Sequence, residues 1–175
     1  LLKLGGIGFD EIPKRYYPEG SSSAHILGFV GNNQEGDDIG YVGIEGFYDK
    51  DLAGLPGLIR SDRDLIDRPI FLGTQEKIDP ENGRDLILTI DKTVQDIVKR
   101  KLIEGVEKYK AKEGCVIVVQ PFTLDILGLS CIPDFDPDHF YDFDSSFYTN
   151  SAISSLYEPG STFKPFIIAA AMQER

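Results

Sequence analysis

The sequence predicts an α+β fold in two parts, and three observations support this prediction. Residues 1–84 combine short apolar runs with frequent Gly, Pro and Asp, and turn signals at spacings of about 8–12 residues favour a β-rich module. Residues 94–109 repeat apolar side chains at spacings of three and four, which indicates an amphipathic helix. Two apolar runs at 115–119 and 125–129 follow that helix. We therefore expect an elongated β-rich module over 1–84 and a second unit over 85–175.

The first part is predicted to hold several short elements. Residues 24–31 (AHILGFVG) read as a short strand that closes in a glycine turn, and residues 41–48 as another extended piece. We expect a turn with one helical turn over 49–57. Further short strands are predicted at 66–72 and 75–78.

The second part is predicted to begin with a strand at 85–90 (DLILTI), followed by the long helix. Asp91 stands where a helix N-cap belongs, because its carboxylate can accept from the free N–H groups of the first turn. The helix should end before Gly114. Residues 115–119 and 125–129 predict an antiparallel hairpin, rich in β-branched side chains and largely buried.

The remainder of the second part is predicted to be a loop followed by another helix. Residues 133–150 carry many Asp and aromatic residues and read as a solvated loop, with its aromatic side chains partly packed beneath it. A second helix is predicted over 161–172, started by the Pro-Gly turn at 159–160.

Composition excludes some classes of function. The 175 residues include 18 Lys and Arg against 29 Asp and Glu, a net charge of −11. A phosphate backbone would be repelled, so nucleic acid is not an expected partner. The longest apolar run, 166–172, is far shorter than the roughly 20 residues that cross a bilayer. The sequence opens without Met and closes inside an apolar helical pattern, so we expect it to be a piece of a longer protein, with any anchor outside it.

The candidate site is the Ser-x-x-Lys pattern formed by Ser161 and Lys164. The preceding Pro-Gly turn would put Ser161 at a helix N-terminus, with Lys164 one turn later on the same face. A serine hydroxyl needs a base to take its proton, and a lysine amine with a depressed pKa can serve as that base. Free N–H groups at the helix end could stabilise an oxyanion. The local pattern also fits an ordinary N-cap serine with a solvent-facing lysine.

Longer segments resemble one family. Residues 157–165 (YEPGSTFKP) are similar to the active-site serine motif of class B penicillin-binding proteins, the D,D-transpeptidases that cross-link bacterial peptidoglycan. Other segments resemble, in the same order, the family's N-terminal module, its junction with the transpeptidase domain and a later loop: residues 15–20 (RYYPEG), 24–31, 43–49 (GIEGFYD), 88–91 (LTID) with Gln95, and 133–138 (PDFDPD).

The resemblance implies a function. Ser161 would be acylated by a stem peptide or a β-lactam, with Lys164 as the general base and no cofactor. The module 1–84 would be a pedestal, and 85–175 the incomplete start of a transpeptidase domain at the extracytoplasmic face of the bacterial cytoplasmic membrane. The family's Ser-x-Asn and Lys-Thr/Ser-Gly motifs do not follow Lys164, so we expect the chain alone to be inactive. The alternative is a non-catalytic pedestal that recruits a glycan polymerase, or a β-lactam sensor.

Arg15, Glu45 and Asp49 are charged residues within the segments that resemble the pedestal. They could cap turns and pair with one another. They could instead form a surface for the membrane-embedded glycan polymerase that, by the resemblance, works with the transpeptidase. For any single residue the structural role is favoured.

No metal site is expected. Residues 134–138 (DFDPD) begin like a calcium loop, but His139 stands where that loop needs Gly and Ser145 where it needs Glu. The two histidines, His25 and His139, follow no zinc-ligand spacing. In its apolar run His25 is expected to be a hydrogen-bonded structural residue.

The pairing of Cys115 with Cys131 depends on the register of the hairpin. If Gln120 opposes Asp125, Cys115 faces Ser130 and Cys131 points to the other face. A turn that is looser by one residue would place the two cysteines opposite each other. The expected state is two free, buried thiols.

Overall fold

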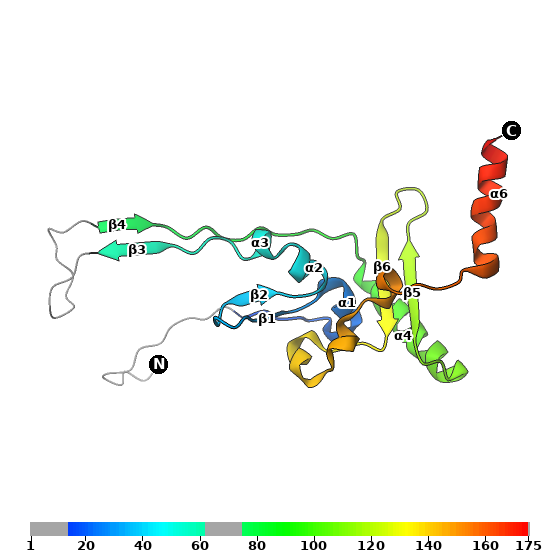
Figure 1. Cartoon of the computed structure of the whole chain (residues 1–175), viewed down its shortest axis with the longest axis horizontal. Helices are drawn as coiled ribbons and strands as arrows, with labels where there is room; N and C mark the ends of the chain where they lie inside the picture. Colours follow the sequence, from blue (N-terminus) through cyan, green and yellow to red (C-terminus); the bar gives the residue numbers. More distant parts are fainter. Residues whose placement is uncertain (1–13, 62–74, 175) are drawn as a thin grey trace.

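The computed structural model describes residues 14–61 and 75–174 of the chain. It shows an elongated molecule with mixed helices and strands (Figure 1), which confirms the predicted α+β class. A long two-stranded arm extends at one end. The longest helix and its hairpin lie toward the other end, and the C-terminal helix stands apart from the body.

The first part contains short helices and two antiparallel ladders. Its elements are η1 (Gly20–Ser23), α1 (Ala24–Leu27), β1 (Val30–Asn32), β2 (Asp38–Gly40), α2 (Gly43–Phe47), α3 (Asp49–Leu52), β3 (Leu58–Ser61) and β4 (Gln75–Ile78). β1 pairs with β2, and β3 with β4 to form the arm. The strand at 75–78 and the helical turn within 49–57 are confirmed, while the strand predicted at 66–72 lies outside the described residues.

Two segments predicted as extended, 24–31 and 41–48, are mainly helical. Residues 24–27 form α1 and residues 43–47 form α2, while Val30 and Gly31 of the first segment are strand residues in β1. The reason is a close approach between the two segments. Gly28 has φ +79°, and a Cβ at that position would lie 1.6 Å from the carbonyl oxygen of Val42. Tertiary packing that only glycine allows therefore overrides the local β preference of these apolar runs.

The second part holds the longest helix and a hairpin. Its elements are α4 (Lys92–Tyr109), β5 (Gly114–Val119), β6 (Ile126–Ile132), η2 (Pro137–Asp142), η3 (Ser145–Tyr148), α5 (Ser151–Ser154), η4 (Gly160–Phe163) and α6 (Lys164–Gln173). The N-cap prediction is confirmed, because the Asp91 carboxylate accepts from the N–H of Val94 at 2.9 Å. The helix ends as predicted, before Gly114.

The strand predicted at 85–90 is not formed. The segment instead touches β6 at single points: the Thr89 hydroxyl donates to the carbonyl oxygen of Ile126 at 2.8 Å, and the Asp91 N–H donates to that of Leu127 at 2.9 Å. These contacts lie along the edge of β6 that does not pair with β5. They cover an edge that would otherwise be open.

The antiparallel hairpin of β5 and β6 is confirmed, but its burial is uneven. β6 is mostly buried where α4 packs against the hairpin. β5 alternates, and Ile117 and Val119 remain 44% and 41% exposed. The expectation of a largely buried hairpin was therefore wrong for one face of β5.

The expectation of free thiols is also wrong, because Cys115 and Cys131 form a disulfide. The loop register is as anticipated, since the Gln120 N–H donates to the carbonyl oxygen of Asp125 at 2.9 Å. A bulge between Val118 and Val119 then shifts the ladder by one residue, so that Cys115 opposes Cys131 with 4.1 Å between their Cα atoms. An irregularity inside the strand, rather than a looser turn, brings the cysteines together.

The main apolar core is aromatic and is shared by both parts. Tyr17, Ala24 and Phe29 come from the first part, and Phe135 from the second. Phe29 is 3% exposed and its ring stacks on that of Phe140 with 4.2 Å between centroids. The two parts therefore meet across one core rather than a thin linker.

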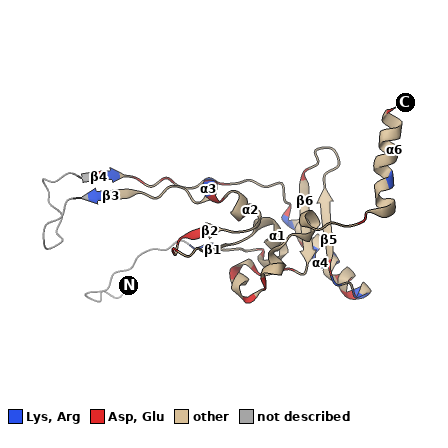
Figure 2. Cartoon of the chain, viewed as in Figure 1, with Lys and Arg blue, Asp and Glu red and all other residues tan. Residues whose placement is uncertain are grey.

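No helix within 14–61 and 75–174 is long and apolar enough to cross a membrane. Charged residues are spread along the chain (Figure 2), with Lys and Arg on the arm and acidic residues at the β1–β2 turn and around η2.

Candidate active site

Ser161 and Lys164 lie at the start of the C-terminal helix. Ser161 belongs to the 3₁₀ turn η4, and Lys164 is the first residue of α6. The turn begins at Gly160, whose φ of +53° is one that glycine adopts without strain. The Lys164 N–H donates to the carbonyl oxygen of Ser161. Residues three apart in a 3₁₀ turn share a face. The backbone at 161–164 is therefore compatible with the prediction that the Ser161 and Lys164 side chains lie on one face.

The site is open to solvent. Ser161, Lys164 and the other described residues of α6 are exposed, and no hydrogen bond joins the two side chains. Phe166 and Ile167 are 67% and 58% exposed, and Lys164 is the helix's only charged residue. A helix that is apolar on all sides is typical of a buried position in a larger domain. Ser161 and Lys164 are therefore three residues apart at the start of a helix, but they lack the water-excluding surroundings that would activate the serine hydroxyl.

The three charged candidates of the first part, Arg15, Glu45 and Asp49, make contacts within the chain. The Arg15 guanidinium makes two contacts of 3.1 Å with the Glu45 carboxylate, one from Nε and one from Nη2. The Asp49 carboxylate accepts from the N–H of Gly40 at 2.6 Å. Arg15 and Glu45 pair with each other as the structural interpretation expected, and Asp49 holds a strand end.

The acidic aromatic segment is more ordered than the predicted loop. Phe135 is fully buried, and Phe140 is partly buried beside it. Asp134 pairs with Lys99 of α4, which holds the start of the segment against the long helix. Within the described residues, no group of three or more His, Cys, Asp or Glu side chains could hold a metal ion.

His25 has the structural role that was predicted. It is 7% exposed, and its Nε2 lies 3.0 Å from the carbonyl oxygen of Phe147. Burial lowers the pKa of the imidazole below its usual 6.5. The neutral tautomer with a proton on Nε2 donates this bond.

Sequence reasoning missed what Gln95 and Tyr17 do. Gln95 is 2% exposed and hydrogen bonds to backbone groups of both parts of the chain. Tyr17 is 7% exposed and its hydroxyl accepts from the N–H of Val30 at 2.9 Å. Both residues lie in segments that resemble the family. Gln95 carries a second signal, because it is a polar residue on the apolar stripe of the helix.

Two family models match this chain. The model described as the Penicillin-binding Protein dimerisation domain matches residues 1–88, and the Penicillin binding protein transpeptidase domain model matches residues 114–175. The chain therefore belongs to the class B penicillin-binding proteins.

Curated relatives agree with this assignment. Stage V sporulation protein D of Bacillus subtilis is 37% identical over 175 residues, which cover 99% of this chain and 26% of that protein. The peptidoglycan D,D-transpeptidase FtsI of Escherichia coli K12 is 33% identical over 174 residues, covering 98% of this chain and 28% of the relative. The chain thus spans about a quarter of the length of the curated relatives that it matches.

A solved structure has the same fold. Penicillin Binding Protein 2X from Streptococcus thermophilus superimposes with a TM-score of 0.71 over 89% of this chain and 24% of that protein, at 24% identity.

Proposed function

We propose that the protein is a serine-type peptidoglycan D,D-transpeptidase that β-lactams acylate. The observation that supports this proposal best is the Ser161–Lys164 pair at the start of an apolar helix, inside the segment that matches the transpeptidase model. Relatives that carry the name peptidoglycan D,D-transpeptidase align along nearly the whole chain.

In the proposed reaction, the Ser161 hydroxyl oxygen attacks the carbonyl carbon of the penultimate D-Ala of a stem peptide. The Lys164 amine takes the hydroxyl proton, and the terminal D-Ala leaves as an amine after protonation. An amino group of a second stem peptide then attacks the acyl-serine ester, which frees Ser161 and forms the cross-link. A β-lactam would acylate the same oxygen by opening its ring.

The 175-residue chain alone is expected to be inactive. Ser161 and Lys164 are both exposed, so neither side chain has the enclosed surroundings in which a lysine amine takes the proton of a serine hydroxyl. Neither Ser-x-Asn nor Lys-Thr/Ser-Gly follows Lys164 in the sequence. The surroundings that activate the serine would come from the rest of a full-length protein.

The test is acylation by a fluorescent penicillin. Full-length protein should be labelled stoichiometrically, and both Ser161→Ala and Lys164→Met should lose labelling by about 10²-fold or more in rate. Ser155→Ala and Lys110→Met are matched controls, because both residues are exposed and lie outside the motif. Labelling of full-length protein that survives Ser161→Ala would refute the assignment.

The proposed setting is the cell envelope, with the domain on the extracytoplasmic face of the bacterial cytoplasmic membrane. The first part would contact a membrane-embedded glycan polymerase through the surface that includes Arg15, Glu45 and Asp49. Charge reversal at a contact residue should weaken the complex without changing the melting temperature. Glu45→Lys would also break the pair with Arg15. Lys77→Glu on the arm is the control, because Lys77 is exposed and, in the part of the chain that the structure describes, pairs with Asp79.

A further inference from the structure

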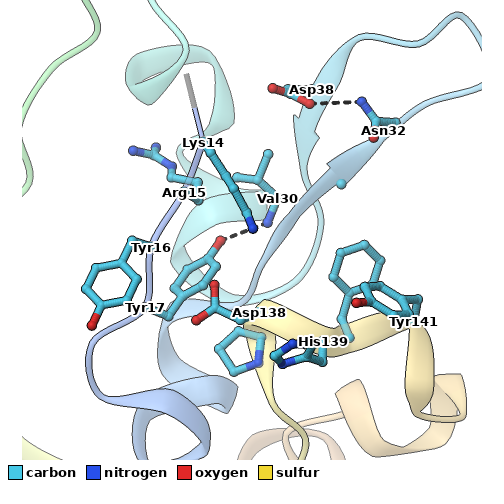
Figure 3. A pocket seen from close by; sticks show the side chains of 13 residues that line it. Lys14, Arg15, Tyr16, Tyr17, Val30, Asn32, Asp38, Asp138, His139 and Tyr141 are labelled. Atoms are coloured by element: carbon cyan, nitrogen blue, oxygen red, sulfur yellow. Dashed lines mark hydrogen bonds between the residues drawn. The ribbon is translucent and has the colours of Figure 1, made fainter. Parts of the chain in front are cut away.

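A pocket of about 860 Å³ lies where the two parts of the chain meet. Figure 3 shows its three walls: the segment of Lys14 to Tyr17, the β1–β2 hairpin, and η2 with Asp138 and His139. The pocket lies outside the segment that holds Ser161. Its volume falls in the range of pockets that hold small molecules or short peptides.

The floor of the pocket holds a hydrogen-bond donor without an acceptor. The Tyr17 side chain is 7% exposed, and its hydroxyl accepts from the Val30 N–H at 2.9 Å. Among residues 14–61 and 75–174, no group accepts the hydroxyl proton. Burial, and then the nearby Glu45 carboxylate, raise the pKa of Tyr17 to about 12. The phenol therefore stays neutral and keeps its proton for a ligand.

The walls add two charges of opposite sign. Lys14 is exposed and Asp138 is half-buried, and neither has an ion-pair partner in the described part of the chain. Figure 3 shows the Lys14 side chain running toward Tyr17, with the Asp138 carboxylate beside the Tyr17 ring.

The other charged groups of the lining are already engaged. Arg15 pairs with Glu45 at 3.1 Å, the Asn32 amide donates to Asp38 at 2.9 Å, and His139 pairs with Asp136 at 3.1 Å. The groups left for a ligand include the Lys14 ammonium, the neutral Tyr17 O–H donor and the Asp138 carboxylate.

We propose that this pocket binds a free α-amino-acid group, in which an ammonium and a carboxylate share one carbon. The ligand carboxylate accepts hydrogen bonds from Lys14 Nζ and the Tyr17 hydroxyl, and the ligand ammonium donates to the Asp138 carboxylate. A simple anion would be repelled by the carboxylates of Asp138 and Asp38, and a simple cation would be repelled by the ammonium of Lys14. Only a zwitterion satisfies both walls at once.

Two sources can supply this chemistry. One is a free amino acid, and the other is a stem peptide whose diamino-acid side chain ends in a free α-amino-acid group. The second source rests on the proposed function, and the size of the pocket leaves room for the rest of such a peptide.

The first experiment titrates the 175-residue chain with three probes, glycine, acetate and methylammonium, and follows amide signals by NMR. Glycine should shift the signals of Val30 and Asp138 with a Kd at least five-fold lower than that of acetate or of methylammonium, each of which carries only one of the two charged groups. Equal Kd values for glycine and acetate, or no shift at these residues, would overturn the proposal.

Variants assign the two halves of the site. Lys14→Met and Tyr17→Phe should each raise the glycine Kd at least three-fold, and Asp138→Asn should remove the advantage of glycine over acetate. Tyr17→Phe also takes the acceptor from Val30, so Lys14→Met, at an exposed position, keeps the test valid if Tyr17→Phe does not fold. Lys110→Met and Asp142→Asn are the matched controls. Unchanged glycine binding in Lys14→Met and Asp138→Asn would refute the assignment.

A last experiment distinguishes a free amino acid from a stem peptide as the ligand. A stem tripeptide with a free side-chain α-amino-acid group is compared with the same peptide amidated at that carboxylate. Tighter binding of the free form than of glycine identifies the peptide as ligand, whereas binding of glycine alone supports the site with a free amino acid. Since no acylation is measured, failure here leaves the test of Ser161 untouched.

Discussion

The Gln95 side chain, on α4, donates a hydrogen bond from Nε2 to the backbone carbonyl oxygen of Ser22, which lies in the first part of the chain. The same side chain also holds β6. Its Nε2 donates to the carbonyl oxygen of Leu129 at 2.7 Å, and its Oε1 accepts from the Leu129 N–H at 2.9 Å. One buried amide thus takes the place of a neighbouring strand at the edge of β6 and joins that edge to the N-terminal module.

Replacing Gln95 should strongly destabilise the protein. Gln95→Leu keeps the size of the side chain but leaves the Ser22 carbonyl and both backbone groups of Leu129 without partners. Each unsatisfied buried group costs about 1–3 kcal/mol, so for three groups we expect a loss of at least about 3 kcal/mol in the free energy of unfolding, measured by urea denaturation.

Lys92→Ala is the matched control for Gln95→Leu. Lys92 lies one turn earlier on α4, and its ion pair with Glu19 at 2.7 Å joins the same two parts of the chain. The Lys92 side chain is 70% exposed, so its loss should lower the free energy of unfolding far less than the loss of Gln95 does, because an exposed ion pair is screened by solvent. A Gln95→Leu variant no less stable than Lys92→Ala would mean that the amide does not join the parts.

The shared aromatic core leads to a second prediction. Phe29→Ala should cost about 3–5 kcal/mol, because Phe29 is 3% exposed and packs on Phe140 and Phe135 from the second part. Phe47→Ala, at a position 81% exposed, should change stability by less than about 1 kcal/mol. Near-UV circular dichroism should lose its aromatic signal in the first variant only. Similar stabilities for the two variants would contradict a core that spans both parts.

The sequence predicted the elements that are set by local pattern. The stripe of residues 94–109 and the N-cap at Asp91 are read from spacing and residue type, and both are confirmed. The paired apolar runs likewise predicted the β5–β6 hairpin. The predictions for α1 and α2 were wrong. The backbone of Val42 packs directly against Gly28, and such a contact between residues distant in sequence cannot be read from a local pattern. Helices of four or five residues carry too little periodicity to be distinguished from short strands.

The candidate site could be predicted only in part. The order of Ser161 and Lys164 and the turn before them follow from the sequence, and the structure places them in η4 and at the start of α6. Their catalytic roles stay a prediction, because no element of the described chain covers them. The register at the cysteines required a bulge that leaves no mark in the residue types of β5 and β6.

His25 makes stability depend on pH. Because burial lowers the pKa of folded His25 below 6.5, the unfolded state binds more protons between the two pKa values. The free energy of unfolding should therefore fall as pH drops below about 6.5, by at most about 1.4 kcal/mol per pH unit. His25→Gln keeps an amide donor for the Phe147 carbonyl and cannot titrate, so its profile should be flatter between pH 7.5 and 5.5. Equal slopes in both proteins would exclude His25 as the cause.

The register of the hairpin predicts a disulfide between Cys115 and Cys131. The two cysteines oppose each other in the ladder, with Cα atoms 4.1 Å apart. Protein prepared under oxidising conditions should show no free thiol when denatured without reductant, and two after reduction. Because the bond closes a loop with a sequence separation of 16 residues, reduction should cost about 3 kcal/mol of stability.

A pair of exchanged residues tests the bulge itself. In the double variant Ser130→Cys and Cys131→Ser, the second thiol occupies the position that would face Cys115 only in a ladder without the bulge. With the bulge in place, Cys115 opposes the new serine hydroxyl at position 131, and the protein should keep two free thiols under the same oxidising conditions. Cys115→Ser, with one free thiol, calibrates the assay. A disulfide in the exchanged variant together with free thiols in the wild type would show that the strands pair in the regular register, with Cys115 facing position 130.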